Sequence, residues 1–349
     1  MQTAQTASIH LIAPLQKRSH KLLLWLFFPL LFVTCYSSAN NLNGFDLTDS
    51  LIPQSKIYAG GPPRDGIPSI DQPRFIAASE DQLLQPESLV IGVSIDGISR
   101  AYPVAILNWH ELVNDQINQQ PVVISYCPLC GTALVYGAGG TVKQGQARSE
   151  NESKVVAVGD GGLRFGVSGL LYNSDLLLYD RNTESLWSQI TGEAISGPMK
   201  GQKLELLPAQ LTSWQQWQSL YPQTVVLSTD TGHRRDYRRS PYGDYDSNER
   251  IYFPVEFLSR RYHPKERVLG VELNGKYKAY PIAELAKHGD LRSLTDSFGD
   301  QQLRIDYDLF SRSGRVFTAN GVELPVINAY WFAWYGFHPK TAVYTANSK

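Results

Sequence analysis

The chain has 349 residues, of which 42% are hydrophobic and 19% are charged, and its formal net charge is −1. This length suffices for one large domain or two ordinary ones, and the apolar fraction suffices for a packed core. The near-zero charge excludes an extended nucleic-acid surface, which would need an excess of Lys and Arg. We therefore expect no nucleic-acid partner, and the 19 Tyr and 7 Trp favour a β-rich protein.

The N-terminus has the anatomy of a signal peptide. Basic residues within 17–21 precede an apolar segment over 22–33, and small residues follow at 37–39. That apolar segment is short for a membrane span. We predict a signal peptide over residues 1–39 that is cleaved after Ala39, and hence a periplasmic or extracellular protein. Membrane association is expected only if this segment is retained.

Residues 40–65 are rich in Asn, Asp, Ser, Pro and Gly, and we expect an extended leader there. Alternating apolar residues over 90–102 predict a β-hairpin. Helical spacing follows over 104–113, with Pro103 suited to the first turn. Residues 121–126 read as the next strand and lead directly into a cysteine motif.

The segment between this motif and the second half of the chain gives weaker signals. Residues 137–162 are rich in Gly and polar side chains and predict a loop or hairpin. Thr212 is placed to cap a short helix that contains Trp214 and Trp217 and ends before Pro222.

The second half of the chain repeats the first. Gly270 and Gly92, Tyr280 and Tyr102, and His288 and His110 are each separated by the same 178 residues. One offset kept across a hairpin and a helix predicts an internal duplication. We expect a β-rich α+β fold with two duplicated units, each a strand hairpin, a helix and a strand, that share one core. The units are predicted over 66–230, with the cysteine motif, and over 231–349, as a degenerate copy with an aromatic C-terminal segment.

The motif Cys127-Pro-Leu-Cys130-Gly131 holds the pair of cysteines expected in the mature protein, because Cys35 lies in the predicted signal peptide. A lone Cys-x-x-Cys pair points to a metal knuckle or a redox pair rather than a disulfide framework. In a knuckle both thiolates face one ion, and the glycine after the second cysteine permits the positive φ of the turn.

His110, upstream of the motif, is the candidate third ligand. Two thiolates and an imidazole suit copper or zinc, with copper slightly favoured. We therefore predict a copper or zinc site of Cys127, Cys130 and His110. The repeat provides an internal control, since the second copy lacks the thiols but keeps His288, so His110 is equally a candidate scaffold residue. Glu111 and Asp115 are candidates to hydrogen-bond the ligands.

These residues leave three functions open. The first is an exported metal-binding protein, or a redox metalloprotein. The second is a thiol–disulfide oxidoreductase in which Cys127 attacks and Cys130 resolves. Residues 131–137 predict a strand, however, and not the helix that a thioredoxin-type mechanism requires. The third is a non-enzymatic binding module braced by a disulfide. The partner would be an unknown small molecule or an exported redox partner.

Several segments resemble a known family. They are Trp109–Asp115, Tyr126–Thr132, Phe165–Asn173 and Asp180–Gln189. Together they are similar to the exported bacterial and archaeal family catalogued as domain of unknown function 3179, and the likeness covers roughly residues 60–345. The resemblance implies an exported domain of this family and implies no reaction.

Overall fold

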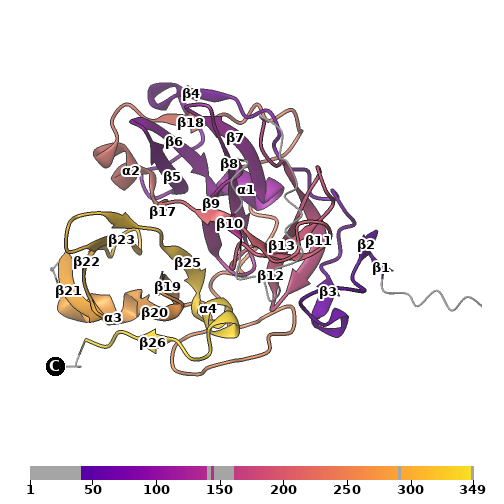
Figure 1. Cartoon of the computed structure of the whole chain (residues 1–349). Coiled ribbons are helices and arrows are strands. Elements are labelled where there is room, and N and C mark those ends of the chain that lie inside the picture. Colours follow the sequence, from indigo (N-terminus) through magenta and orange to yellow (C-terminus); the bar gives the residue numbers. More distant parts are fainter. Residues whose placement is uncertain (1–40, 140–142, 145–160, 290–291, 347–349) are drawn as a thin grey trace, which may run out of the picture. The chain divides into compact units, whose positions relative to one another are not determined.

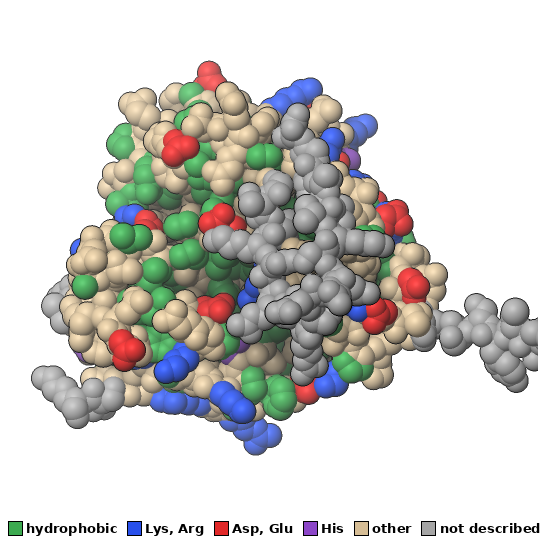
Figure 2. All heavy atoms as spheres, viewed as in Figure 1, with side chains coloured by type: hydrophobic (Ala, Val, Ile, Leu, Met, Phe, Trp, Pro, Cys, Tyr) green, Lys and Arg blue, Asp and Glu red, His purple; other side chains and the backbone are tan. Residues whose placement is uncertain are grey.

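The computed structural model describes residues 41–139, 143–144, 161–289 and 292–346 (Figure 1). The predicted signal peptide and most of the predicted loop over 137–162 lie outside these residues. The described chain is β-rich with a few short helices, which confirms the β-rich prediction. Within it, no helix is both long enough and apolar enough to cross a membrane. Figure 2 shows acidic and basic side chains interspersed over the viewed face.

Two sheets contain the first predicted hairpin and the strands that carry the cysteines. In spatial order, the eight-stranded sheet consists of β26 (Ala342–Val343), β20 (Lys276–Pro281), β19 (Arg267–Leu273), β25 (Ile327–Tyr330), β9 (Thr132–Gly137), β8 (Gln120–Cys127) and β7 (Leu112–Ile117), with β16 (Glu205–Leu206) paired to β9. A five-stranded sheet consists of β17 (Gln210–Ser213), β5 (Leu89–Ile95), β6 (Ile98–Pro103), β18 (Val225–Leu227) and β4 (Phe75–Ala77).

The other strands form a second five-stranded sheet, a four-stranded sheet and two small ribbons. The five-stranded sheet consists of β14 (Ala194–Ser196), β13 (Leu186–Ser188), β12 (Asp175–Asp180), β11 (Phe165–Tyr172) and β3 (Ile57–Ala59). The four-stranded sheet consists of β21 (Ser293–Phe298), β22 (Gln301–Asp308), β23 (Ser313–Thr318) and β24 (Glu323–Leu324). The ribbons pair β1 (Asn41–Leu42) with β2 (Phe45–Asp46), and β10 (Lys143–Gln144) with β15 (Gln202–Lys203).

The described helices are short. They are α1 (Val104–His110), α2 (Trp214–Leu220), α3 (Ile282–Leu285) and α4 (Trp331–Phe337), with 3-10 turns η1 (Gln54–Lys56), η2 (Ala78–Glu80) and η3 (Ala286–His288).

The helix predicted over 104–113 is too long. It ends at His110 because Glu111 has a φ of 59°, which a right-handed helix cannot continue. The chain then enters β7, so a strand separates the helix from the strand that ends at Cys127. The predicted cap of α2 is also corrected by one residue, since the Ser213 hydroxyl accepts the Gln216 N–H at 3.2 Å.

The predicted first hairpin is confirmed, with Gly92 opposite Ala101 in the β5–β6 ladder. Gly92 has no side chain because the ring of Trp217, from α2, occupies the space that a Cβ would need. Gly270, opposite Ala279 in β19–β20, is covered in the same way by Trp334 of α4. Each helix thus packs on its hairpin through a Trp ring that lies directly against a glycine.

A methyl group at either glycine must push the indole aside. We expect Gly92→Ala and Gly270→Ala each to lower the free energy of unfolding by about 1–3 kcal/mol, the usual cost of overpacking a core. Chemical denaturation of the purified variants measures this loss. Gly161→Ala is the matched control, because nothing lies within 4 Å of a Cβ built there. Equal stabilities of all three variants would contradict the packing role.

Candidate metal centre

The β8–β9 hairpin carries both cysteines at its tip. Regular pairing ends where Cys127 lies opposite Thr132, and the intervening residues form the turn. Gly131 has the predicted positive φ, at 60°, and a Cβ there would lie 2.8 Å from the Tyr330 ring. Glycine is therefore required both by the backbone conformation and by the close approach of Tyr330.

The β11–β12 hairpin brings a carboxylate to the same place. Its turn residues Asn173 and Ser174 have φ values of 50° and 67°, the pattern of a two-residue turn with positive φ at both positions. Asp175 is then the first residue of β12. The Cys130 thiol donates to the Ser174 carbonyl oxygen at 3.1 Å, which joins the two hairpin tips.

Cys127, Cys130 and Asp175 form one buried cluster. Their two sulfurs and a carboxylate oxygen all lie within 4.8 Å of one another. Each side chain is no more than 2% exposed. Both cysteines are free thiols, so the interpretation of a bracing disulfide does not describe this structure.

A chain of buried polar side chains holds Asp175 in place. Thr132 Oγ1 lies 2.9 Å from Asp175 Oδ1 and 2.5 Å from Gln189 Oε1, and Gln189 Nε2 donates to Ser125 Oγ at 2.8 Å. All of these residues are buried. The chain links strands of two different sheets and fixes the carboxylate beside the thiols.

Several polar atoms in this region lack partners. Asp175 Oδ2 and the hydroxyls of Ser174 and Tyr245 are buried with no hydrogen-bond partner among the described residues. Tyr245 belongs to the same core cluster as the two cysteines. Since an unpaired buried polar atom costs free energy, these atoms favour a site that receives a further group. Two sulfurs and one carboxylate oxygen are a donor set that zinc accepts.

Burial controls the protonation of the cluster. It raises the pKa of Asp175 to about 7 and raises the pKa of the Cys130 thiol well above its usual range. The low-dielectric interior penalises the charged forms of both groups. A bound cation would reverse this penalty by stabilising the thiolates and the carboxylate.

Lys265 anchors the segment that covers the cluster. Its buried ammonium donates to the carbonyl oxygens of Asn248 at 2.7 Å and Arg250 at 2.8 Å, and also to that of Tyr245. The ammonium lies 3.4 Å from the centre of the Tyr245 ring. One buried cation thus holds the segment over residues 245–250 and keeps Tyr245 in the core of the site.

His110, the predicted third ligand, is not a member of this cluster. Its Nδ1 lies 2.7 Å from the Pro68 carbonyl oxygen, and its Nε2 lies 2.7 Å from the Tyr237 hydroxyl. Burial lowers its pKa to about 4, so the ring is neutral, with Nδ1 donating to Pro68 and Nε2 accepting from Tyr237. Both ring nitrogens are therefore engaged at the end of α1.

A cavity of about 370 Å³ is lined by Glu111 and by sequence neighbours of the cluster residues. Leu129 lies between the two cysteines, Leu176 follows Asp175, and both line this cavity. The Tyr242 hydroxyl donates to Glu111 Oε1 at 3.2 Å, and burial raises the pKa of Glu111 to about 7. The other lining residues are mostly apolar: Gly60, Pro62, Ile67, Val167, Gly169, Leu170, Leu171, Pro241, Tyr252 and Phe253.

Sequence reasoning found both thiols and named Glu111 as a neighbour, but it missed Asp175. This residue is distant from the cysteines in sequence, and no local motif connects them. The available signal was the turn sequence Tyr172-Asn-Ser-Asp175 between two apolar strands, which predicts a tight hairpin.

The buried carboxyl of Glu111 gives the protein a distinctive pH dependence. The unfolded chain ionises this residue near pH 4.5, whereas the folded protein retains the proton up to about pH 7. Its contribution to stability is therefore lost as the pH rises from about 4.5 to 7. We expect Glu111→Gln to become more stable than the unsubstituted protein over this range, by up to about 3 kcal/mol.

Urea denaturation at a series of pH values measures this difference, since Gln keeps the shape and the acceptor for Tyr242. Glu87→Gln, at an exposed position, is the control and should leave the pH profile unchanged. A pH-independent difference between Glu111→Gln and the unsubstituted protein would show that Glu111 is ionised when folded.

The family described as "Protein of unknown function (DUF3179)" matches residues 64–323, which is more than half of the chain. The chain therefore belongs to this family, as its motifs predicted. No match was found among curated proteins or among solved structures.

Proposed function

We propose that this DUF3179 protein is a metal-binding protein whose ligands are Cys127, Cys130 and Asp175. The observation that carries the proposal is the convergence of two free thiols and a carboxylate, within 4.8 Å, in a buried site. A hard carboxylate ligand suits zinc better than Cu(I), which prefers soft ligands alone. We therefore favour zinc over copper.

Asp175, rather than His110, is proposed as the third ligand. Asp175 Oδ2 is buried and unpaired, whereas both nitrogens of His110 already have partners. His288 of the second repeat makes the same kind of bond, with its Nε2 2.7 Å from the Tyr344 hydroxyl. A His–Tyr pair that recurs without thiols supports a scaffold role for His110.

Three protein ligands leave a coordination position for a substrate or water, the arrangement of catalytic zinc sites. A bound zinc ion supplies Lewis-acid chemistry there. The cavity beside Leu129 is large enough for a small molecule, and its lining is mostly apolar. Glu111, with a pKa of about 7, is suited to hold or release a proton at this cavity near neutral pH.

Metal content by mass spectrometry of the purified protein, prepared under reducing conditions, tests the proposal. We expect about one zinc per chain, lost in Cys127→Ser/Cys130→Ser, because a site of this kind needs its thiolates. Asp175→Asn should fold, since the amide still reaches Thr132, but should bind zinc at least about tenfold more weakly. His110→Asn should keep the metal. Zinc retained by Asp175→Asn but lost from His110→Asn would reverse the ligand assignment.

A thiol–disulfide oxidoreductase is the second candidate. Asp175 favours it, because its carboxylate oxygen lies within 4.8 Å of both sulfurs and burial raises its pKa to about 7, which suits a group that exchanges a proton with a thiol near neutral pH. Oxidation of Cys127 and Cys130 to a disulfide would reduce an exported disulfide partner. The strand β9 after the pair argues against a thioredoxin-type nucleophile, which needs a helix N-terminus at this place. Turnover of a disulfide substrate that Cys127→Ser abolishes would establish this function instead.

We also infer that the chain arose by duplication. Each half has a hairpin, a helix and a three-stranded meander, in β5–β9 and in β19–β23, followed by a strand, a helix and a parallel strand. Trp217 Nε1 donates to Thr224 at 2.9 Å, and Trp334 Nε1 donates to Thr341 at 3.1 Å, seven residues later in both cases. These matched details support common ancestry of the halves.

Export remains a proposal that rests on the composition of residues 1–39. N-terminal sequencing of the protein from a cell fraction outside the cytoplasm tests it, with Asn40 as the expected first residue.

A further inference from the structure

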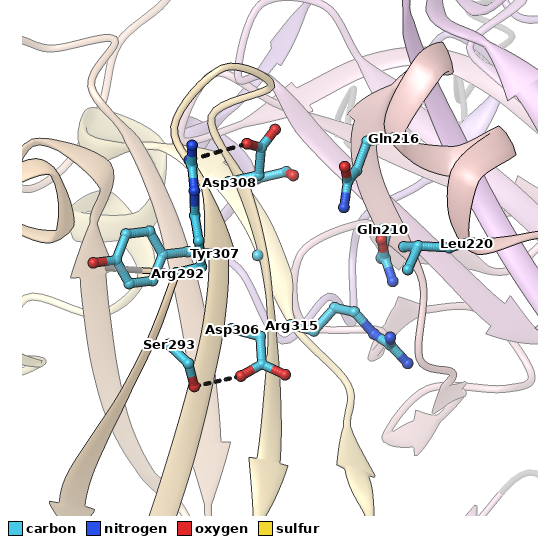
Figure 3. Close-up of a pocket in the computed structure, with 11 residues that line it drawn as sticks. Gln210, Gln216, Leu220, Arg292, Ser293, Asp306, Tyr307, Asp308 and Arg315 are labelled. Carbon is cyan, nitrogen blue, oxygen red and sulfur yellow. Dashed lines mark hydrogen bonds and ion pairs between the residues drawn. The ribbon is translucent and has the colours of Figure 1, made fainter. Parts of the chain in front are cut away.

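A second cavity, of about 530 Å³, lies between the two halves of the chain, on the outer side of β17 and α2 (Figure 3). Gln210, Gln216 and Leu220 line it from the first half. The sheet of β21–β23 supplies the opposite wall, with Arg292, Ser293, Asp306, Tyr307, Asp308, Ser313, Gly314 and Arg315. Figure 3 shows Gln210 on one side of this space and Asp306, which faces Ser293, on the other.

Gln210 is the residue that indicates a ligand. It is only 5% exposed, and it lines the cavity. Figure 3 shows this amide directed into the cavity. Because an amide both donates and accepts hydrogen bonds, it can pair with an occupant that does the same.

The charges on the cavity wall cancel. Arg292 pairs with Asp308 at 3.4 Å, and Arg315 forms a two-pronged ion pair with Glu323. Asp306 Oδ1 accepts from Ser293 at 2.6 Å and from Arg304 at 3.1 Å, and its Oδ2 has no partner in the described chain. An anion or a cation would have to break one of these pairs, whereas a neutral ligand would not.

We propose that this cavity binds a neutral polyhydroxylated molecule, a sugar unit, through Gln210, Asp306 and Arg315. Neighbouring hydroxyl groups donate and accept in pairs, as planar carboxylate, amide and guanidinium groups do. The apolar face of a sugar ring matches Leu220 at the rim. The volume accommodates one or two sugar rings. This site requires neither the thiols nor a metal, so it is separate from the proposed metal centre.

The first experiment screens the purified protein on a glycan array and then titrates the best-bound sugar by calorimetry, free and as the terminal unit of a glycan. We expect binding in the millimolar to micromolar range. Gln210→Leu, which keeps the side-chain volume, should weaken it at least about tenfold, and Asp306→Asn should do the same. Gln218→Leu, the same change on α2 at a residue that does not line the cavity, should bind normally.

Several outcomes would overturn the proposal. One is no binding of any sugar up to about 10 mM, a concentration that reveals even weak sites. Another is binding that neither Gln210→Leu nor Asp306→Asn weakens. Asp306→Asn changes a partly exposed wall residue, so it tests the site even if Gln210→Leu fails to fold. Sugar binding that persists in Cys127→Ser/Cys130→Ser would separate this site from the metal proposal.

Discussion

The structure around the site depends on the need to pair buried polar groups. Four buried side chains form hydrogen bonds to one another where two sheets meet: Asp175, Thr132, Gln189 and Ser125. An unpaired group in this position would cost more than a hydrogen bond contributes elsewhere. The pairing therefore fixes the relative position of the β8–β9 and β11–β12 tips, and with it the distance between the thiols and the carboxylate.

The same burial also controls the protonation of the cluster. Burial favours the protonated forms of Asp175 and Cys130 by raising the pKa of each. A divalent ion would replace those protons and satisfy the unpaired Asp175 Oδ2. The metal proposal thus explains three features together: two free thiols, a buried acid and an unpaired oxygen. The cavity at Glu111 then provides the neighbouring space in which such a centre would act.

The two halves of the chain share an order of strands and helices but differ in the segment that follows the meander. In the first half, the segment from β11 to β16 lies between β9 and β17 in sequence and covers the cysteine turn. In the second half, only β24 lies between β23 and β25. The corresponding turn, near Asp308 and Ser313, therefore borders an open polar cavity instead of a buried cluster. Under the proposed duplication, the presence or absence of a covering segment distinguishes the candidate metal centre from the candidate sugar site.

The sequence by itself determined the family, the first hairpin, the glycine at the cysteine turn and the strand that follows it, because each depends on local spacing or backbone preference. The helical spacing predicted a longer α1 than the structure has. The positive φ that ends the helix at Glu111 follows from tertiary packing and cannot be recognised from helical spacing. Only the tertiary structure decided that Asp175 joins the thiols and that both nitrogens of His110 are occupied. Those facts depend on which distant strands pack together, and long-range burial is not encoded in the spacing of neighbouring residues.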